Sequence, residues 1–217
     1  MVIVAVIMML VLGRLIASLY DFLLDLLICG HFLQKSVNRK IKTTDYTSSQ
    51  SCRYFIIESI FKNLSLHSEG NFLEVGCGQG RVLAFLKHKK TKWQLTGIES
   101  NPLALKICHQ WADNTEITIL EKDVFTHNIS DYNIFFVGHP FDDNNLSLFI
   151  KKIENEVVEK VLVILVLDIK LGNFISQRKG WSISQRETIH TYYNLPILPQ
   201  KNRYTIYYYS PNNYDNN

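Results

Sequence analysis

Three glycines at alternate positions, directly after a short apolar segment, constrain the fold of this chain more than any other feature. The apolar segment covers residues 71–75, and Gly76, Gly78 and Gly80 follow it. Apolar residues then recur at helical spacing over residues 82–86. Glycine accepts positive φ and lacks a Cβ, so such a loop lets a ligand approach the backbone at the N-terminus of the next helix. The pattern predicts a strand, a ligand-binding turn and a helix, which together begin an α/β fold.

The residues around the loop favour a ligand that carries a positive charge and no phosphate. A dinucleotide site has the spacing G-x-G-x-x-G, and its third glycine would fall where this chain has Arg81. Glu74, two residues before the first glycine, suits the ammonium group of S-adenosylmethionine. An NAD-dependent oxidoreductase is the less favoured alternative. We therefore expect an S-adenosylmethionine site that includes Glu74, Gly76, Cys77, Gly78 and Gly80.

The next two predicted strands also lead to acidic residues. Residues 93–99 are expected to form a strand that ends in Glu99, and an acid at this point accepts hydrogen bonds from ribose hydroxyls in nucleoside-binding α/β folds. A third predicted strand, residues 116–120, leads to Asp123. With these motifs in this order, the run 72–168 resembles a class I S-adenosylmethionine-dependent methyltransferase of the small bacterial type with an N-terminal hydrophobic helix.

The resemblance implies both a fold and further cofactor contacts. The implied fold is α/β and Rossmann-like, with a seven-stranded, mostly parallel sheet, one antiparallel strand and an N-terminal hydrophobic helix. Glu99 then matches the ribose acid, and Asp123 matches the residue that usually meets the adenine amino group. No metal is expected. The predicted cofactor contacts beyond the glycine loop are Glu99, Ser100, Asp123, Val124 and Gly138.

The segment after a fourth predicted strand, residues 132–137, is where the resemblance implies that the methyl acceptor binds. Related enzymes that methylate amino groups often have Asn-Pro-Pro-Tyr or Asn-Pro-Pro-Phe there, whereas this chain has His139 in place of the asparagine. An amide donates and accepts hydrogen bonds at once, but a neutral imidazole divides these roles between two nitrogens. Because histidine titrates near neutral pH, we predict that His139 is a catalytic general base. The alternative is that His139 caps the next helix or bonds a loop.

The remaining segments complete the predicted sheet and the domain organisation. A crossover helix is expected near residues 146–157, a buried parallel strand at 160–168, and a last pair of strands at 180–189 and 203–209. The predicted organisation is a hydrophobic or amphipathic helix at 1–29, a linker at 30–50, a methyltransferase domain at 51–210 and a disordered tail at 211–217.

Composition narrows the classes of partner. The chain has 217 residues, of which 47% are hydrophobic, enough for one substantial core. Its net charge of +3 is too small to indicate a nucleic-acid partner. The cysteines show no metal-ligand spacing and are expected to be reduced thiols; they are Cys29, Cys52, Cys77 and Cys108.

The N-terminus is the second informative part of the chain. Residues 2–13 contain no charged side chain. The polar residues that follow are spaced by four, three and four positions, so on a helix they form one narrow stripe: Arg14, Ser18, Asp21 and Asp25. The segment therefore predicts one long helix. A removable signal peptide is not expected, because no basic region precedes the apolar run and no small-residue cleavage site follows it.

Three arrangements of this helix are open: it spans a bilayer, lies on one, or packs within the protein. The fully apolar run is shorter than the roughly 20 residues that a bilayer core requires. Basic residues follow the helix, and the positive-inside rule then places the next domain in the cytoplasm; they are Lys35, Arg39, Lys40 and Lys42. We expect residues 1–29 to associate the chain with a membrane.

The predicted function is transfer of a methyl group from S-adenosylmethionine to an unidentified acceptor, from a position tethered at the cytoplasmic membrane face. The alternative is a catalytically silent sensor or scaffold that binds the cofactor on the same fold. The sequence specifies neither the acceptor nor the oligomeric state.

Overall fold

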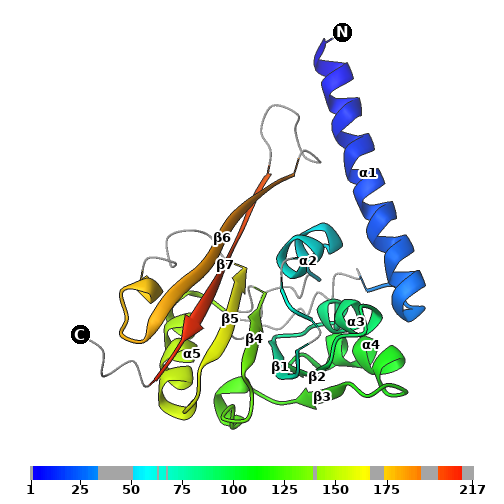
Figure 1. The fold of residues 1–217 in the computed structure, drawn as a ribbon. Coiled ribbons are helices and arrows are strands. Elements are labelled where there is room, and N and C mark those ends of the chain that lie inside the picture. Colours follow the sequence, from blue (N-terminus) through cyan, green and yellow to red (C-terminus); the bar gives the residue numbers. More distant parts are fainter. Residues whose placement is uncertain are drawn as a thin grey trace, which may run out of the picture.

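The described residues of the computed structural model form one sheet with helices on both faces (Figure 1). The strands are β1 (Gly70–Val75), β2 (Trp93–Glu99), β3 (Thr118–Glu121), β4 (Ile134–Val137), β5 (Val161–Val166), β6 (Trp181–Thr191) and β7 (Gln200–Tyr209). The helices are α1 (Val2–Cys29), α2 (Tyr54–Phe61), α3 (Arg81–His88), α4 (Pro102–Ala112) and α5 (Asp143–Glu156), with a 3₁₀ turn η1 (Val124–Thr126). The structure describes residues 2–33, 51–62, 64–66, 68–138, 141–166, 174–191 and 200–211.

The strand order confirms the predicted Rossmann-like sheet. The order of the seven described strands is β3-β2-β1-β4-β5-β7-β6. All pairs from β3 to β5 are parallel, whereas β7 is antiparallel to both β5 and β6. Among the described strands, β7 alone therefore runs against the others, as predicted. The parallel strands all end at one edge of the sheet, which we call the carboxyl edge.

Successive residues of the central strands enter different cores on the two faces of the sheet. Phe72 and Phe136 lie in the core beneath α2, α3 and α4, while Leu73 and Phe135 lie in the core beneath α5. This alternation follows from the two-residue period of a strand. It explains why apolar residues follow one another directly in these strands, as at Phe72–Leu73 and Phe135–Phe136, instead of alternating with polar ones.

Strand boundaries differ from the predicted ones where local turns take up the backbone. The third strand begins at Thr118 because the N–H of Ile117 donates to the Thr115 hydroxyl in a preceding turn. The fourth begins at Ile134 because the N–H of Tyr132 donates to the carbonyl of Ile129. An amide that bonds within a turn is not available to a neighbouring strand.

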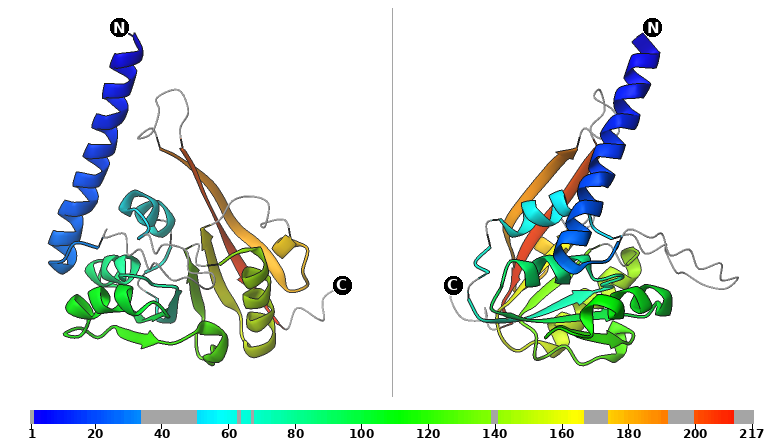
Figure 2. Two further views of the ribbon diagram at one scale, coloured as in Figure 1. Left: turned by 180° about the vertical axis from the view of Figure 1, so that it is seen from behind. Right: turned by 90° about the vertical axis from the view of Figure 1, so that its right-hand side faces the viewer.

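The β6–β7 hairpin extends past the carboxyl edge. Val166, the last residue of β5, pairs with Tyr204, so residues 200–203 of β7 continue beyond the described part of β5 and pair there with β6. Figures 1 and 2 show the end of this hairpin on the same side of the sheet as the N-terminus of α1. Both elements thus project from the edge at which the parallel strands end.

Helix α1 confirms the predicted single long helix (Figure 2). Among the side chains of α1 that the structure describes, the buried ones lie in its C-terminal half. Ala17, Asp21 and Asp25 are buried against the domain. The opposite side of the helix is exposed and apolar; it carries Leu12, Leu15, Ile16, Leu19, Leu23, Leu26 and Leu27. Within the described ranges, no helix has the length and hydropathy that a membrane crossing needs.

Candidate active site

The glycine loop between β1 and α3 is wound in the left-handed conformation at every glycine. The φ angles are +68° at Gly76, +56° at Gly78 and +82° at Gly80. A Cβ at Gly80 would come within 2.6 Å of the Trp111 ring and 2.8 Å of the Cys108 sulfur. Position 80 requires a residue that accepts a positive φ and that has no Cβ. Only glycine meets both requirements, so the shape of the loop depends on this glycine.

Glu99 holds the glycine loop from the neighbouring strand. Its Oε2 accepts the N–H of Gly78 at 2.9 Å, and its Oε1 accepts the N–H groups of Ser100 and Asn101, each at 2.8 Å. A carboxylate offers about four acceptor positions, so roughly one remains after these three bonds. The structure thereby joins three predicted site residues, namely Gly78, Glu99 and Ser100.

Glu74 lies at the end of β1 with a buried, incompletely bonded carboxyl group. The residue is 5% exposed, and among the described residues no hydrogen-bond partner reaches its Oε2. Burial raises the pKa of Glu74 well above its usual range, and a hydrogen bond from the Leu83 backbone opposes this only in part. A cationic group of a ligand would compensate the charged form, so this orphaned oxygen fits the predicted cofactor.

The remaining predicted contacts lie at the ends of the neighbouring strands. The Asp123 side chain accepts the N–H of Phe125 at 2.9 Å and so begins η1, where Val124 is buried. The N–H of Lys122 donates to the Glu99 carbonyl, which connects this segment to β2. Gly138 directly follows β4 and is exposed, while His139, the predicted general base, lies outside the described residues.

Cys77 belongs to the loop but its thiol faces inward. It is buried, and a hydrogen bond with Cys108 together with burial raises the pKa of the Cys77 thiol well above its usual range. A thiol with a raised pKa is a poor nucleophile. Cys77 therefore contributes its backbone to the loop, and its side chain packs below it.

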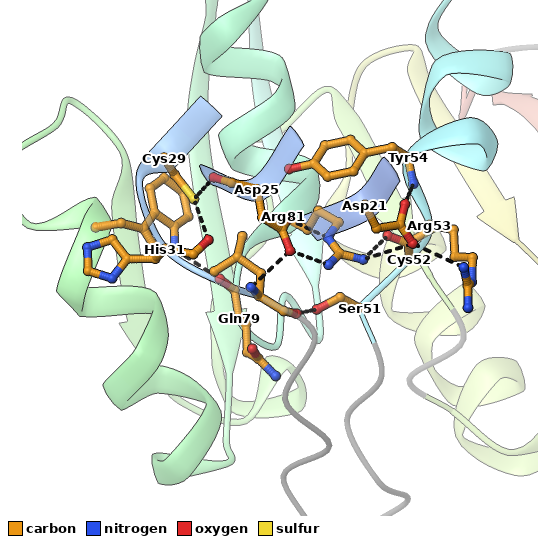
Figure 3. A network of polar contacts seen from close by, with 12 residues as sticks. Asp21, Asp25, Cys29, His31, Ser51, Cys52, Arg53, Tyr54, Gln79 and Arg81 are labelled. Carbon is orange, nitrogen blue, oxygen red and sulfur yellow. Dashed lines mark hydrogen bonds and ion pairs between the residues drawn. The ribbon is translucent and has the colours of Figure 1, made fainter. Parts of the chain in front are cut away.

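A buried ion-pair cluster beside the loop was not foreseen from the sequence (Figure 3). Arg81, the residue after Gly80, is 1% exposed and donates to both carboxylate oxygens of Asp25, at 2.9 and 2.6 Å. Asp21 lies one helical turn earlier on α1 and meets Arg53 at 3.3 Å. The polar stripe on α1 was visible in the sequence, but its partner was not.

A hollow of about 1100 Å³ lies at the other end of the strands. Its lining includes Gly70, Trp93 and Thr118, which are the first residues of β1, β2 and β3. It is therefore separated from the carboxyl edge by the length of the sheet. The candidate site is the group of residues at the carboxyl edge.

Comparisons with known proteins agree with this architecture. The model of the family described as "Methyltransferase small domain" matches residues 56–172, which is more than half of the chain. No protein of curated function matches the sequence.

Solved structures of several methyltransferases share the fold at low sequence identity. A methyltransferase from Pyrococcus furiosus has a TM-score of 0.59 and 14% identity, over 91% of this chain and 98% of that one. Precorrin-6y C5,15-methyltransferase from Geobacter metallireducens GS-15 has a TM-score of 0.57 and 13% identity, over 73% and 89%. An RNA methyltransferase from Salinibacter ruber, solved with S-adenosyl-L-homocysteine, has a TM-score of 0.54 and 13% identity, over 76% and 97%. The chain therefore belongs to the methyltransferase small-domain family, which confirms the prediction of a class I S-adenosylmethionine-dependent methyltransferase.

Proposed function

We propose that this chain binds S-adenosylmethionine at the glycine loop and transfers its methyl group to a nucleophile on an acceptor molecule. The observation that carries the proposal is the hydrogen bond from Gly78 to Glu99, which holds the glycine loop against the end of the second strand. The remaining acceptor position of Glu99 suits a ribose hydroxyl. The orphaned oxygen of Glu74 suits the ammonium group, and the segment Asp123–Val124 suits the adenine.

In this reaction the main task of the protein is to position the methyl donor and the acceptor. The bound cofactor supplies an electrophilic methyl group, and its transfer leaves S-adenosylhomocysteine. The loop residues Gly76, Gly78 and Gly80 bring the backbone close, while Glu99 fixes the loop. Holding acceptor and donor in line and keeping water out provides most of the acceleration in such a reaction.

We retain His139 as the proposed general base that removes a proton from the acceptor nucleophile. An imidazole changes its protonation state near neutral pH, which this role requires. The variant His139→Ala is expected to abolish turnover and to leave affinity for S-adenosylhomocysteine within about threefold, because a base does not bind the cofactor. Unchanged turnover would leave His139 with the alternative role of a helix cap.

Two measurements separate the proposed activity from its alternatives. Calorimetric titration with S-adenosylhomocysteine and with NAD is expected to show binding of the first alone, and preference for NAD would indicate an oxidoreductase. Incubation with methyl-labelled S-adenosylmethionine and fractionated cell extract is expected to label one class of acceptor. Cofactor binding without any labelled product would indicate a catalytically silent sensor or scaffold.

We further propose that α1 tethers the chain at the cytoplasmic face of a membrane. The exposed side of α1 is apolar from Leu12 to Leu27, and residues 2–13 offer no polar face at all. A partner helix would cover one stripe, whereas a helix that is apolar on every side is typical of burial in a core or in lipid. Twelve residues extend about 18 Å, roughly half of a bilayer's hydrocarbon core, which suits insertion into one leaflet.

Vesicle flotation tests the tether. The full chain is expected to float with phospholipid vesicles, and a variant that lacks residues 2–13 is expected to stay in the aqueous fraction. This deletion keeps Asp21 and Asp25, so the docked part of α1 is preserved. The tether is contradicted if the full chain never floats and instead has the mass of a dimer, which the deletion reduces to that of a monomer. The partner of the apolar helix would then be a second copy of the chain.

A further inference from the structure

Arg81 is a fully buried cation held by oxygen atoms from two other segments of the chain (Figure 3). Its Nε and Nη2 donate to the two oxygens of Asp25 at 2.9 and 2.6 Å, and its Nη1 donates to the carbonyl of Cys52 at 3.2 Å. The guanidinium also lies over the Tyr54 ring, 5.1 Å from its centroid. A bidentate pair of this kind fixes orientation as well as distance.

Arg81 is also the residue at which the glycine loop ends and α3 begins. The entry of the loop is fixed by β2, because the N–H groups of Gly76 and Cys77 both donate to the carbonyl of Ile98. Left-handed glycines have little stiffness of their own, so the shape of the loop depends on both of its ends being held. At the exit, two polar side-chain attachments hold the loop: Trp111 Nε1 donates to the carbonyl of Gln79 at 3.0 Å, and Arg81 binds Asp25 on α1.

We propose that Asp25 is a positioning residue of the cofactor site, which acts through Arg81 to fix the exit of the glycine loop. The docked part of α1 is then a component of the site, in addition to any role of the helix as a tether. The inference rests on the proposed binding of S-adenosylmethionine at this loop. In the sequence, α1 and the methyltransferase domain look like separate units, so this role of α1 in the site is not suggested there.

Asp25 carries this role more directly than Asp21. Asp25 is completely buried and forms the bidentate pair, and its Oδ2 also accepts the N–H of Leu33 at 3.0 Å. Asp21 is 3.9 Å from the Arg81 Nη1, and its closer partners are Arg53 and the N–H of Tyr54. Asp21 therefore orients the segment before α2, and its loss is expected to disturb the loop less.

The test measures affinity for S-adenosylhomocysteine in the full-length chain, well below the unfolding temperature of each variant. Asp25→Asn is expected to weaken binding at least tenfold, since small displacements of a binding loop cost about that much. Arg81→Lys is expected to weaken it similarly, because lysine keeps the charge but not the planar fork. In steady state the KM for S-adenosylmethionine is expected to rise while kcat at saturation changes by less than about threefold.

A remote ion pair provides the matched control. Glu154 on α5 accepts hydrogen bonds from Arg178 at 2.6 Å and from Trp181 at 2.9 Å, on the opposite face of the sheet from α3. The variant Glu154→Gln also breaks a bidentate pair and is expected to lower the unfolding temperature. Its affinity for S-adenosylhomocysteine is expected to stay within about twofold of wild type, because distant sites act independently.

A double variant separates positioning from stability. Replacing both partners, Asp25→Leu with Arg81→Met, removes both charges of this pair and leaves Asp21 with Arg53; removing a buried pair together often restores stability. Apolar contacts are not directional, so they stabilise the fold without fixing the orientation of the loop exit. We therefore expect the unfolding temperature to recover while binding of S-adenosylhomocysteine stays at least tenfold weaker than in wild type. Recovery of affinity along with stability, or wild-type affinity in Asp25→Asn, would overturn the proposal. If the wild-type chain itself does not bind S-adenosylhomocysteine, the proposed function fails and this inference fails with it.

Discussion

The backbone N–H of Gly78 donates to Oε2 of Glu99 at 2.9 Å, although the two residues are 21 positions apart in the sequence. One side chain at the end of β2 thus carries two tasks. It holds the glycine loop, and roughly one of its acceptor positions remains for a ligand. Substitutions here are therefore expected to affect the loop and the ligand together.

Glu99→Gln is expected to weaken S-adenosylhomocysteine binding by about 10- to 100-fold, because charge-assisted bonds are replaced and an amide donor is turned toward backbone N–H groups. Isothermal titration measures this loss. Glu121→Gln is the matched control, since Glu121 is exposed at the end of β3 and pairs with Glu99 in the sheet register. Equal losses in the two variants would contradict the special role of Glu99.

Gly80→Ala is expected to destabilise the fold by at least about 3 kcal/mol and to abolish cofactor binding, because it adds overpacking to backbone strain. Gly30 provides a control for strain alone, since its φ is +73° and nothing lies within 4 Å of an added Cβ. Gly30→Ala is therefore expected to cost only about 1 kcal/mol. Denaturant unfolding compares the two variants, and similar costs would show that Trp111 and Cys108 yield to the new methyl group.

Glu74 is expected to make the ligand-free chain less stable as the pH rises. Its folded pKa lies above the usual value near 4.5, so between these two values the folded state holds a proton that the unfolded state has lost. Stability then falls as the pH rises from about 4.5. Glu74→Gln removes this dependence. The unfolding temperature of the variant minus that of wild type is therefore expected to increase from pH 5 to pH 8.

Glu154 is expected to show the opposite dependence. Burial opposes its charge, but hydrogen bonds from Arg178 and Trp181 prevail and lower its pKa. The contribution of Glu154 to folding stability is therefore present at pH values above its unfolded-state pKa near 4.5. It is lost as the pH falls through the folded-state pKa. The deficit of Glu154→Gln relative to wild type is expected to shrink toward pH 3. Parallel pH profiles for the two glutamine variants would be inconsistent with these assignments.

Truncation of α1 is expected to have two separate effects. A chain that lacks residues 2–13 keeps Asp21 and Asp25 and is expected to bind S-adenosylhomocysteine like wild type. A chain that lacks residues 1–29 loses Asp25, the partner of Arg81, together with the apolar contacts that Leu24 and Ile28 make with the core. Its cofactor binding and its unfolding temperature are both expected to fall. Full binding by the shorter chain would contradict a role of α1 in the site.

Much of the fold could be predicted because its signals are local. The glycine spacing, the acid at the end of β2 and the apolar run of β5 each depend on a few neighbouring residues, and the structure has all three elements. Asn101 caps α4 by accepting the N–H of Leu103, with Pro102 as the first helical residue, an arrangement that local sequence encodes. The strand ends were less accurate, because turns at Thr115 and Ile129 compete with the sheet for backbone N–H groups.

The sequence by itself determined the kind of protein: an α/β methyltransferase fold with a glycine loop, an acid beside it and a long apolar helix in front. It also showed that Asp21 and Asp25 share one side of that helix. Only the tertiary structure decided what this side faces. Arg81 appeared in the sequence merely as the absence of a third glycine, yet it is the buried partner of Asp25, 56 positions away. Charge pairing in a core depends on which surfaces the fold brings together, and no local pattern records that choice.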